Sequence, residues 1–427
     1  MKSRKLLYNP SQILTIDTQG TNLKRGKALN DLNLVTDHSV LIEDNLIADI
    51  ISNSSLRKTT YDSSLDLTGK TILPGLIECH THSVFTGSRT DEFRQKLAGV
   101  NYETIAKSGG GINSTVKSVR ESSFEEIVDA AKPRIDNFIS QGITTLEIKS
   151  GYGLDFKNEI KLLQVINYLN EIYPINIVPT FLGAHTFPVE LKDNRSKYVD
   201  EIINKMLPHI AKQNLATFCD GFCETTAFSS DEIDLIFSKA KELGLKLKLH
   251  TEQFNTIGGL DVALKHKAST VDHLEVINKE DIPKFSNIET VAVLLPGVSF
   301  FLNHTYAPAR KLIDNDAIIA LATDFNPGSS HISNLHLIMS IAALKMGMTI
   351  EETINAVTIN AAKALNVENN VGSIEIDKEA DFSVINSNEY VDIVYNIGQN
   401  MNCITIKEGN IIYNSTNLEF SKSFISI

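Results

Sequence analysis

The chain has 427 residues, of which 42% are hydrophobic and 22% are charged, a composition that is ordinary for a soluble globular protein. Its 40 basic and 52 acidic residues give a formal net charge of −12, which argues against a nucleic acid or an anionic membrane as a partner. The four cysteines provide no disulfide framework, and no apolar stretch approaches the roughly 18 residues of a membrane span. The basic N-terminus, which no apolar run follows, does not resemble a secretion signal, so we expect a cytoplasmic protein.

Both ends of the chain have the pattern of β-structure. Residues 1–70 contain short apolar runs, two of which flank a turn at Asp44–Asn45. Residues 372–427 contain similar runs around a turn at Gly409–Asn410. Because the two segments share this character although they are far apart in sequence, we predict that they pair into one small β-sandwich domain.

Residues 71–371 alternate between short apolar runs and segments of helical period, which is typical of parallel βα units. Helices are predicted over residues 124–140, 159–172 and 230–244. Eight buried strands predict the α/β class and, within it, a closed (β/α)8 barrel of the TIM type. These strands are expected over residues 71–80, 143–149, 175–185, 216–224, 245–250, 269–273, 290–297 and 317–324.

Titratable side chains stand at the ends of five of the predicted strands. His80 ends the first strand, His185 the third, His250 the fifth, His273 the sixth and Asp324 the eighth. In barrels of this type the catalytic residues lie on the face where the carboxyl ends of the strands meet. We therefore predict that these five side chains gather at one mouth of the barrel.

The stretch His80–Thr81–His82 predicts a metal site. Side chains two residues apart lie on the same face of a strand, so both imidazoles would point to one side. With His250 and Asp324 they form a nitrogen and oxygen ligand set that suits zinc or iron, with a position left open for water. We predict one divalent metal ion per chain, Zn or Fe, bound by His80, His82, His250 and Asp324. Taken alone, the pair could instead be two surface or loop histidines whose hydrogen bonds are satisfied.

Charged and aliphatic residues alternate in two of the predicted strands. Glu147 and Lys149 share one face of their strand, and Lys246 and Lys248 share the face of His250. If His250 faces the barrel interior, so do these charges, and buried charges must be paired. We predict an interior ion pair between Glu147 and either Lys248 or Lys149.

Longer motifs resemble a known group of enzymes. PGLIECHTH, His250, His273 and ALATDFNPG resemble the amidohydrolase superfamily of metal-dependent barrel hydrolases, and EADFSVIN resembles a part of its small β domain. CHTHSVFTGSRTDEF, YETIAKSGGGINSTV, EIKSGYGL and TDFNPGSS resemble the imidazolonepropionase family within it, and the likeness covers essentially the whole chain. The resemblance implies hydrolysis of 4-imidazolone-5-propanoate, a small anionic heterocycle, to N-formimidoyl-L-glutamate in histidine degradation.

The resemblance also implies which residues contact the substrate. Arg89 would clamp the propionate, because a guanidinium can bind a carboxylate through two hydrogen bonds. Tyr152, between two glycines, would lie over the ring, and His185 would contact substrate rather than metal. The other expected contacts are Gln253, Asn326, Gly328 and Ser329. Each residue also has an alternative role. Arg89 could be a solvated loop arginine, Tyr152 could serve in packing only, and His185 could be a fourth histidine ligand. The loop after Asp324 could be a simple turn before a helix.

Three residues are expected to take part in the chemistry. His273 would stabilise the oxyanion that develops when water attacks the ring carbonyl. Either His273 or Asp324 would take the proton of the water and deliver it to the leaving ring nitrogen. Gln253 would orient water or substrate but cannot be a base. The alternative for His273 is a core histidine with a structural role.

Several alternatives stay open at this point. Cys219 and Cys223 are interpreted as buried apolar thiols rather than zinc ligands, and Glu224 could bring a second metal ion to the site.

Another activity of the superfamily, such as deamination of a nitrogen heterocycle, would release ammonia. A barrel that serves as a non-catalytic scaffold would hold no metal. A homodimer is expected, because barrels of this kind often form symmetric pairs.

Overall fold

The structure, a computed structural model, describes residues 3–99 and 110–422. Its largest sheet has eight strands in chain order, and each is parallel to its neighbours in the sheet. The predicted α/β class and (β/α)8 barrel are therefore confirmed. The barrel strands are β8 (Leu76–Glu78), β9 (Ile143–Lys149), β10 (Asn176–Ala184), β11 (Phe218–Cys223), β12 (Lys246–Thr251), β13 (Thr270–His273), β14 (Val291–Leu294) and β15 (Ile318–Leu321).

The two outer strands of this sheet, β8 and β15, approach each other just past their carboxyl ends. An isolated bridge pairs Thr81 with Phe325, and the His82 N–H donates to the Phe325 carbonyl at 2.9 Å. The segments that carry His82 and Asp324 are thus joined by the backbone. This contact brings residues that are more than 200 positions apart in sequence to one end of the barrel.

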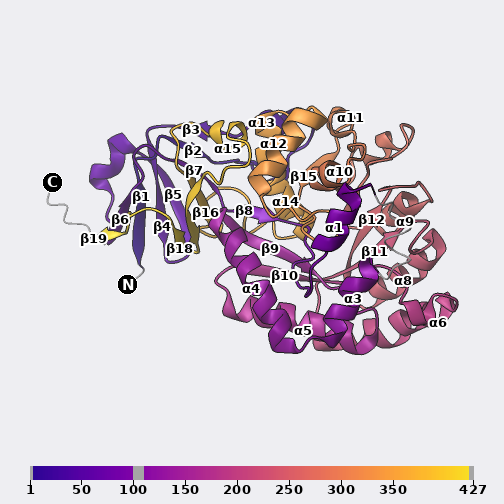
Figure 1. Cartoon of the computed structure of the whole chain (residues 1–427). Coiled ribbons are helices and arrows are strands. Elements are labelled where there is room, and N and C mark those ends of the chain that lie inside the picture. The colour runs from indigo at the N-terminus through magenta and orange to yellow at the C-terminus, as the bar shows by residue number, and fades with distance from the viewer. Residues whose placement is uncertain (1–2, 100–109, 423–427) are drawn as a thin grey trace.

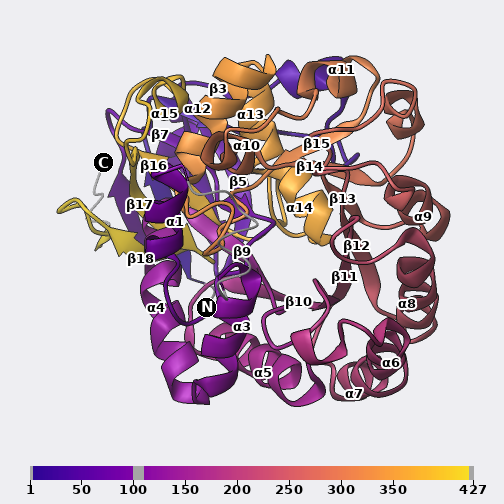
Figure 2. The same ribbon diagram turned by 45° about the vertical axis from the view of Figure 1, so that its right-hand side comes forward.

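Helices surround the barrel strands (Figure 2). Leu146 and Ile148 of β9 belong to one buried apolar cluster with Ile135 of α4 and Leu163 of α5, so the outward face of the strand packs on helices. The described ranges contain no helix with both the length and the apolar character needed to cross a bilayer. The helices are α1 (Thr90–Leu97), α3 (Ile112–Glu121), α4 (Phe124–Ser140), α5 (Phe156–Ile172), α6 (Arg195–Glu201), α7 (Leu207–Gln213), α8 (Ser230–Glu242), α9 (Gly259–His266), α10 (Pro296–Leu302), α11 (Ala309–Asp314), α12 (Leu335–Met346), α13 (Ile350–Ala356), α14 (Ile359–Leu365) and α15 (Asp392–Tyr395).

Strands from both ends of the chain build two further sheets, seen in indigo and yellow at the left of Figure 1. β19 pairs with β6, and an isolated bridge joins Leu46 to Glu379, which confirms that the terminal segments pair. β16 pairs with β7, which begins just past residue 70. Apolar side chains of both sheets, such as Ile42 and Ile404, form one buried cluster, as in a β-sandwich. The strands are β1 (Arg4–Tyr8), β2 (Gln12–Leu14), β3 (Leu34–Val35), β4 (His38–Glu43), β5 (Leu46–Ser52), β6 (Ser63–Asp66), β7 (Thr71–Pro74), β16 (Phe382–Ile385), β17 (Asn402–Lys407), β18 (Asn410–Asn414) and β19 (Ser421–Lys422).

The strand expected over residues 71–80 is two strands in two sheets. β7 lies in the six-stranded terminal sheet, whereas β8 lies in the barrel. Gly75 separates them, and a Cβ atom there would lie 2.2 Å from the Thr144 Oγ1, so only glycine fits where the chain crosses to the barrel. His80 and His82 consequently follow the end of β8, in an extended segment, rather than lying within a strand.

Candidate metal and substrate site

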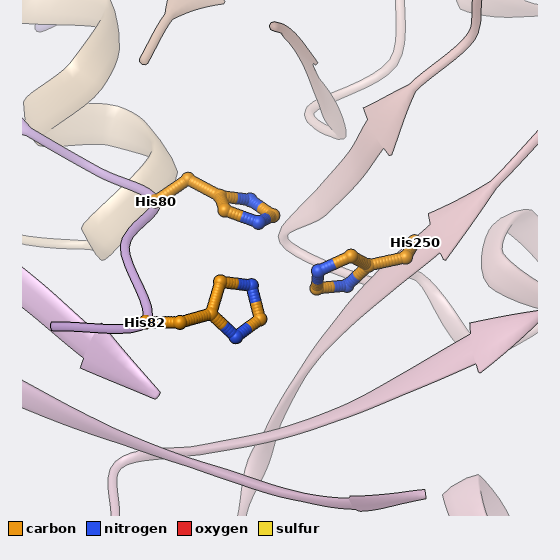
Figure 3. A group of neighbouring side chains, drawn as sticks. All are labelled: His80, His82 and His250. Carbon is orange, nitrogen blue, oxygen red and sulfur yellow. The ribbon is translucent and has the colours of Figure 1, made fainter. Parts of the chain in front are cut away.

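Three imidazoles converge at the carboxyl end of the barrel strands (Figure 3). His80 and His82 follow β8, and His250 belongs to β12, on the opposite side of the ring of strands. The ring centroids of His80 and His250 are 4.5 Å apart, and those of His82 and His250 are 5.6 Å apart. One ring nitrogen of each histidine lies within 4.8 Å of the other two. The three histidines predicted as ligands are therefore close enough to share one ion.

Asp324 joins this group from the loop after β15. Its Oδ1 lies 3.4 Å from the His80 Nε2 and 3.3 Å from the His82 Nε2. Its backbone has a φ of 48°, in the left-handed region that non-glycine residues rarely adopt. Such strain is concentrated at functional sites, where the surrounding structure holds the residue in place. All four side chains are buried.

The atoms that face one another in this cluster need a partner. Among the described residues, the His80 Nε2, the His250 Nε2 and the Asp324 Oδ1 are buried without a hydrogen bond, which is unusual for polar atoms. Two ligands of a tetrahedral zinc ion are roughly 3.3–3.6 Å apart when each is about 2.0–2.2 Å from the metal. The separations between Asp324 and the two histidines are close to this value. The donor set therefore fits a divalent cation.

Two aspartates that the sequence analysis did not single out bond to the backs of these imidazoles. The His80 Nδ1–H donates to the Asp272 Oδ2 at 2.6 Å, and the His250 Nδ1–H donates to the Asp220 Oδ1 at 3.1 Å. An ionised carboxylate can only accept, so the proton is on Nδ1 of each ring. Each Nε2 is thereby left as the atom that can bind a metal.

Charge in the cluster is distributed unevenly. Burial lowers the pKa of His250 to about 4, although Asp220 acts in the opposite direction. For His80, burial and Lys149 also lower the pKa, but Asp272 and Asp324 outweigh them and raise it to about 9. These two carboxylates therefore stabilise positive charge at His80, whether the charge is a proton or a metal ion at Nε2.

The predicted interior ion pair is present and is part of a larger network. The Lys149 Nζ and the Lys248 Nζ each lie 2.9 Å from a Glu147 oxygen, and all three side chains are fully buried. The Lys149 Nζ also donates to the Asp220 Oδ2 at 2.8 Å. Although burial alone would lower the pKa of Lys149, Asp220 and Glu147 raise it, so the ammonium stays charged. Lys246 was expected inside as well, but it is exposed, because it is the first residue of β12 at the far end of the barrel.

A cavity of about 770 Å³ opens beside the histidines. Its walls include metal-site residues and every residue predicted to contact the substrate. Residues 102–109 of the motif YETIAKSGGGINSTV lie outside the described residues. The predicted residues in the wall are His82, Arg89, Tyr152, His185, His250, Gln253, His273, Asp324, Asn326, Gly328 and Ser329.

Arg89 lies against the backbone of the Asp324 loop. Its Nε donates to the Glu92 Oε2 at 2.8 Å, and its Nη2 is also 2.8 Å from that oxygen. A Cβ atom at Gly328 would be 2.0 Å from the Arg89 Nη1. The guanidinium thus occupies the space that any side chain at position 328 would need.

Aromatic rings line the wall of the cavity beside His82. His185 is stacked on His82 with a centroid distance of 5.2 Å, and Tyr152 lies 5.4 Å from His185. The His185 Nδ1–H donates to the Gly151 carbonyl at 3.0 Å, since a carbonyl can only accept. Its Nε2 is therefore the atom available to a ligand. Burial and the neighbouring Asp324 raise the pKa of Tyr152, so its phenol remains a donor.

The loop that carries Tyr152 is held by a carboxylate that the sequence analysis missed. Glu159 of α5 accepts hydrogen bonds from the backbone N–H groups of Gly151, Gly153 and Leu154 at 3.1, 2.7 and 2.9 Å. Its side chain is fully buried. Three donors on one carboxylate fix the loop against the start of the helix.

The loop after Asp324 is organised by Asn326. Its Oδ1 accepts from the backbone N–H groups of Gly328 and Ser329 at 2.8 and 2.7 Å, and its Nδ2 donates to the Asp324 carbonyl at 2.7 Å and the Ser329 Oγ at 2.9 Å. These four bonds use both N–H groups of the amide and both lone pairs of its oxygen. Asn326 therefore shapes the wall of the cavity and fixes the backbone that follows Asp324.

His273 is anchored by a second carboxylate that was not predicted. Its Nδ1 lies 3.3 Å from the Glu275 Oε1, and its ring centroid is 5.4 Å from that of His250. Burial would lower the pKa of His273, but Glu275 raises it above the ordinary value. The backbone φ of 86° at His273 is again one that non-glycine residues rarely adopt. Gln253, three residues after His250, lies in the wall of the same cavity.

The structure limits the roles that Cys219, Cys223 and Glu224 can have. Cys219 and Cys223 are free and buried, as expected for apolar thiols, and burial raises the pKa of Cys223 to about 12. The Glu224 carboxylate accepts from the backbone N–H groups of Phe254 and Asn255, both at 3.0 Å. Within the described ranges it belongs to neither cluster of potential metal ligands.

The sequence and the fold are similar to those of known proteins. Residues 71–412 match the amidohydrolase family. The chain is 41% identical to the imidazolonepropionase of Flavobacterium johnsoniae over 95% of this chain and 99% of that protein. It is 43% identical to the imidazolonepropionase of Christiangramia forsetii over 89% of this chain and 92% of that protein. Among solved structures, a zinc complex of the atrazine chlorohydrolase of Arthrobacter aurescens TC1 superimposes with a TM-score of 0.67 at 14% identity, covering 96% of this chain and 95% of that one. At that identity the likeness concerns the fold alone.

Proposed function

This chain belongs to the amidohydrolase family and, within it, to the imidazolonepropionases, and from that premise we propose how its residues share the reaction. The enzyme is a hydrolase of histidine degradation that opens the ring amide of 4-imidazolone-5-propanoate to give N-formimidoyl-L-glutamate. The observation that carries the assignment of roles is the convergence of three imidazoles and Asp324 at a cavity that Arg89 also lines.

We propose that His80, His82, His250 and Asp324 hold one divalent metal ion, Zn or Fe, per chain. The interior charges support a bound cation. Five buried carboxylates lie against the interior lysines and the site histidines, and two ammonium groups balance only two of them; the five are Glu147, Asp220, Asp272, Glu275 and Asp324. A divalent ion offsets most of the remaining negative charge. When bound, such an ion supplies Lewis acidity, which polarises a carbonyl and makes water more acidic.

Arg89 binds the propionate of the substrate. Glu92 lies against the Nε and Nη2 of the guanidinium, so both N–H groups of the Nη1 beside Gly328 and the second N–H of Nη2 are left for an anion. A guanidinium keeps its charge and presents fixed donors, which suits a carboxylate. The ring of the substrate then lies along His185 and Tyr152, whose Nε2 and phenol can bond to it.

Asp324 and His273 are the groups placed to move a proton. Glu275 holds the His273 Nδ1, which directs the Nε2 toward the site, and Asp324 has a second oxygen besides the Oδ1 that faces the histidines. One of the two takes the proton of the attacking water and delivers it to the ring nitrogen as the carbon–nitrogen bond breaks. The other stabilises charge on the carbonyl oxygen, and Gln253 orients the water or the substrate.

The test joins product analysis to metal analysis. The purified enzyme should contain one divalent metal ion per chain and convert 4-imidazolone-5-propanoate to N-formimidoyl-L-glutamate without release of ammonia. Ammonia as product would favour a deaminase, and a chain that neither contains nor takes up metal would favour a scaffold.

His273→Ala should lose at least about 100-fold in kcat with its metal retained. Near-normal turnover would remove His273 from the chemistry.

We also propose a homodimer in the cytoplasm. The four free, buried cysteines suit a reducing compartment. Leu344 of α12 and Tyr395 of α15 are 67% and 76% exposed on two helices that contact each other, so they offer apolar surface for a symmetric contact. Light scattering after gel filtration should give twice the mass of the chain, and a monomer at micromolar concentration would contradict the proposal.

A further inference from the structure

The barrel interior contains a second group of potential metal ligands next to the first. Ligand atoms of Asp220, His250 and Asp272 lie within 4.8 Å of one another. All three side chains are buried, and the Asp272 Oδ1 has no hydrogen-bond partner among the described residues. The His250 Nδ1–H already donates to Asp220, so the free donors of this group are carboxylate oxygens, which divalent cations accept. The two aspartates can therefore help to hold a cation.

A lysine already lies at this group. The Lys149 Nζ is 2.8 Å from the Asp220 Oδ2, 4.0 Å from the Asp272 Oδ2 and 2.9 Å from the Glu147 Oε2. Lys149 belongs to β9, whereas Asp220 and Asp272 belong to β11 and β13. One fully buried ammonium thus joins carboxylates from three barrel strands.

We propose that Lys149 is a built-in cation that takes the place of a second metal ion and keeps the centre mononuclear. The Lys149 ammonium lies between Glu147, Asp220 and Asp272, where a second cation would have to bind. A dication placed beside this buried ammonium would be strongly repelled. An ammonium attached to the chain cannot exchange with ions in solution, so the number of metals is set by the sequence. This inference rests on the proposed metal site at His80, His82, His250 and Asp324.

Lys248 provides a matched comparison. It is also fully buried, and its Nζ contacts Glu147 at 2.9 Å, as that of Lys149 does. Its other bond is to the Cys79 carbonyl at 2.9 Å, and no ion pair links it to Asp220 or Asp272 within the described chain. Replacing either lysine by methionine removes one buried positive charge next to Glu147. Only the replacement of Lys149 frees the carboxylates of the second group.

The experiment counts metal ions in the full-length enzyme. Wild type, Lys149→Met and Lys248→Met are incubated with excess zinc, freed of unbound metal by gel filtration and analysed by mass spectrometry for zinc per chain. We expect one ion in wild type and Lys248→Met and two in Lys149→Met. Adding Asp220→Asn to Lys149→Met should return the count to one, because the second site loses a ligand.

The outcomes separate this inference from the proposed function. One ion in wild type and one in folded Lys149→Met would overturn the role of Lys149 and leave the metal site intact. No ion in wild type would overturn both. If Lys149→Met is recovered unfolded from metal-poor medium, it is refolded with excess zinc. Two ions per refolded chain support the proposal, and failure to refold or a count of one contradicts it.

Discussion

At the scale of single residues, the substrate site depends on a position that has no side chain. A Cβ atom at Gly328 would overlap the Arg89 Nη1, at 2.0 Å. Gly328→Ala should therefore displace the guanidinium and weaken the bond that we propose it makes to the propionate, while His80, His82 and Asp324 keep their places. A hydrogen bond between charged groups contributes about 1.5–3 kcal/mol, so we expect KM to rise about 10- to 100-fold with metal content unchanged.

A double-mutant cycle checks the cause of this effect. In an Arg89→Gln background, Gly328→Ala should raise KM by less than about 3-fold, because the contact it disturbs is already lost. Steady-state kinetics and metal analysis on the four proteins provide the numbers. Equal effects in the two backgrounds would mean that Gly328 acts on the site without Arg89.

Asp220 and Asp272 illustrate what sequence patterns can and cannot provide at this scale. His80, His82, His250 and Asp324 are predicted as ligands because their residue types and their places at or near strand ends both indicate a metal. The rule that buried charges need partners led to Glu147 and its lysines, and applied to CDGF and TVDH it would also have found the two aspartates. Which carboxylate meets which histidine depends on neighbouring strands in the barrel, and no pattern within one strand specifies that.

At the scale of secondary-structure elements, α5 positions the loop that carries Tyr152 through one buried carboxylate. Glu159→Ala would leave three buried N–H groups, of Gly151, Gly153 and Leu154, without an acceptor. Each buried unsatisfied donor costs about 1–3 kcal/mol, although the loop can relax. We expect a loss of about 2–4 kcal/mol in the free energy of unfolding, measured in denaturant, and a several-fold rise in KM.

Glu171→Ala is the control for this prediction. Glu171 lies on the same helix and is exposed, so its replacement should change stability by less than about 0.5 kcal/mol. If Glu159→Ala were as stable as this control and bound substrate normally, the carboxylate would not hold the Tyr152 loop.

The elements themselves were well predicted where local signals are strong. α4 begins after a capping box of Ser123 and Glu126, and it spans the predicted residues 124–140 despite Pro133. The error over residues 71–80 has a physical origin. An apolar run of ten residues with a central glycine has the same composition whether it is one strand or two, and only the crossing at Gly75 into another sheet distinguishes them. The division of the chain at residues 70/71 and 371/372 stays a prediction.

At the scale of the whole molecule, one histidine links the barrel to the terminal sandwich. His336 of α12 donates from Nε2 to the Gln141 carbonyl at 3.2 Å, and its Nδ1 accepts from the Met401 N–H at 3.4 Å, next to β17. This arrangement requires a neutral ring, because a proton on Nδ1 would face another N–H. Burial lowers the pKa of His336 to about 4, although the bond to Gln141 acts in the opposite direction.

This linkage predicts how stability depends on pH. The unfolded chain protonates His336 near its ordinary pKa of about 6.5, whereas the folded chain resists protonation down to about 4. The stabilisation is therefore fully present above pH 6.5 and is lost as the pH falls toward 4, because the unfolded state takes up the proton first. The loss amounts to at most about 3 kcal/mol.

In His336→Asn the free energy of unfolding should fall less steeply over this window, whereas His331→Asn, at an exposed histidine, should follow wild type. Denaturant titrations at pH 7, 6, 5 and 4.5 measure the difference, and parallel curves for His336→Asn and wild type would show that the contact between barrel and sandwich does not depend on a neutral His336.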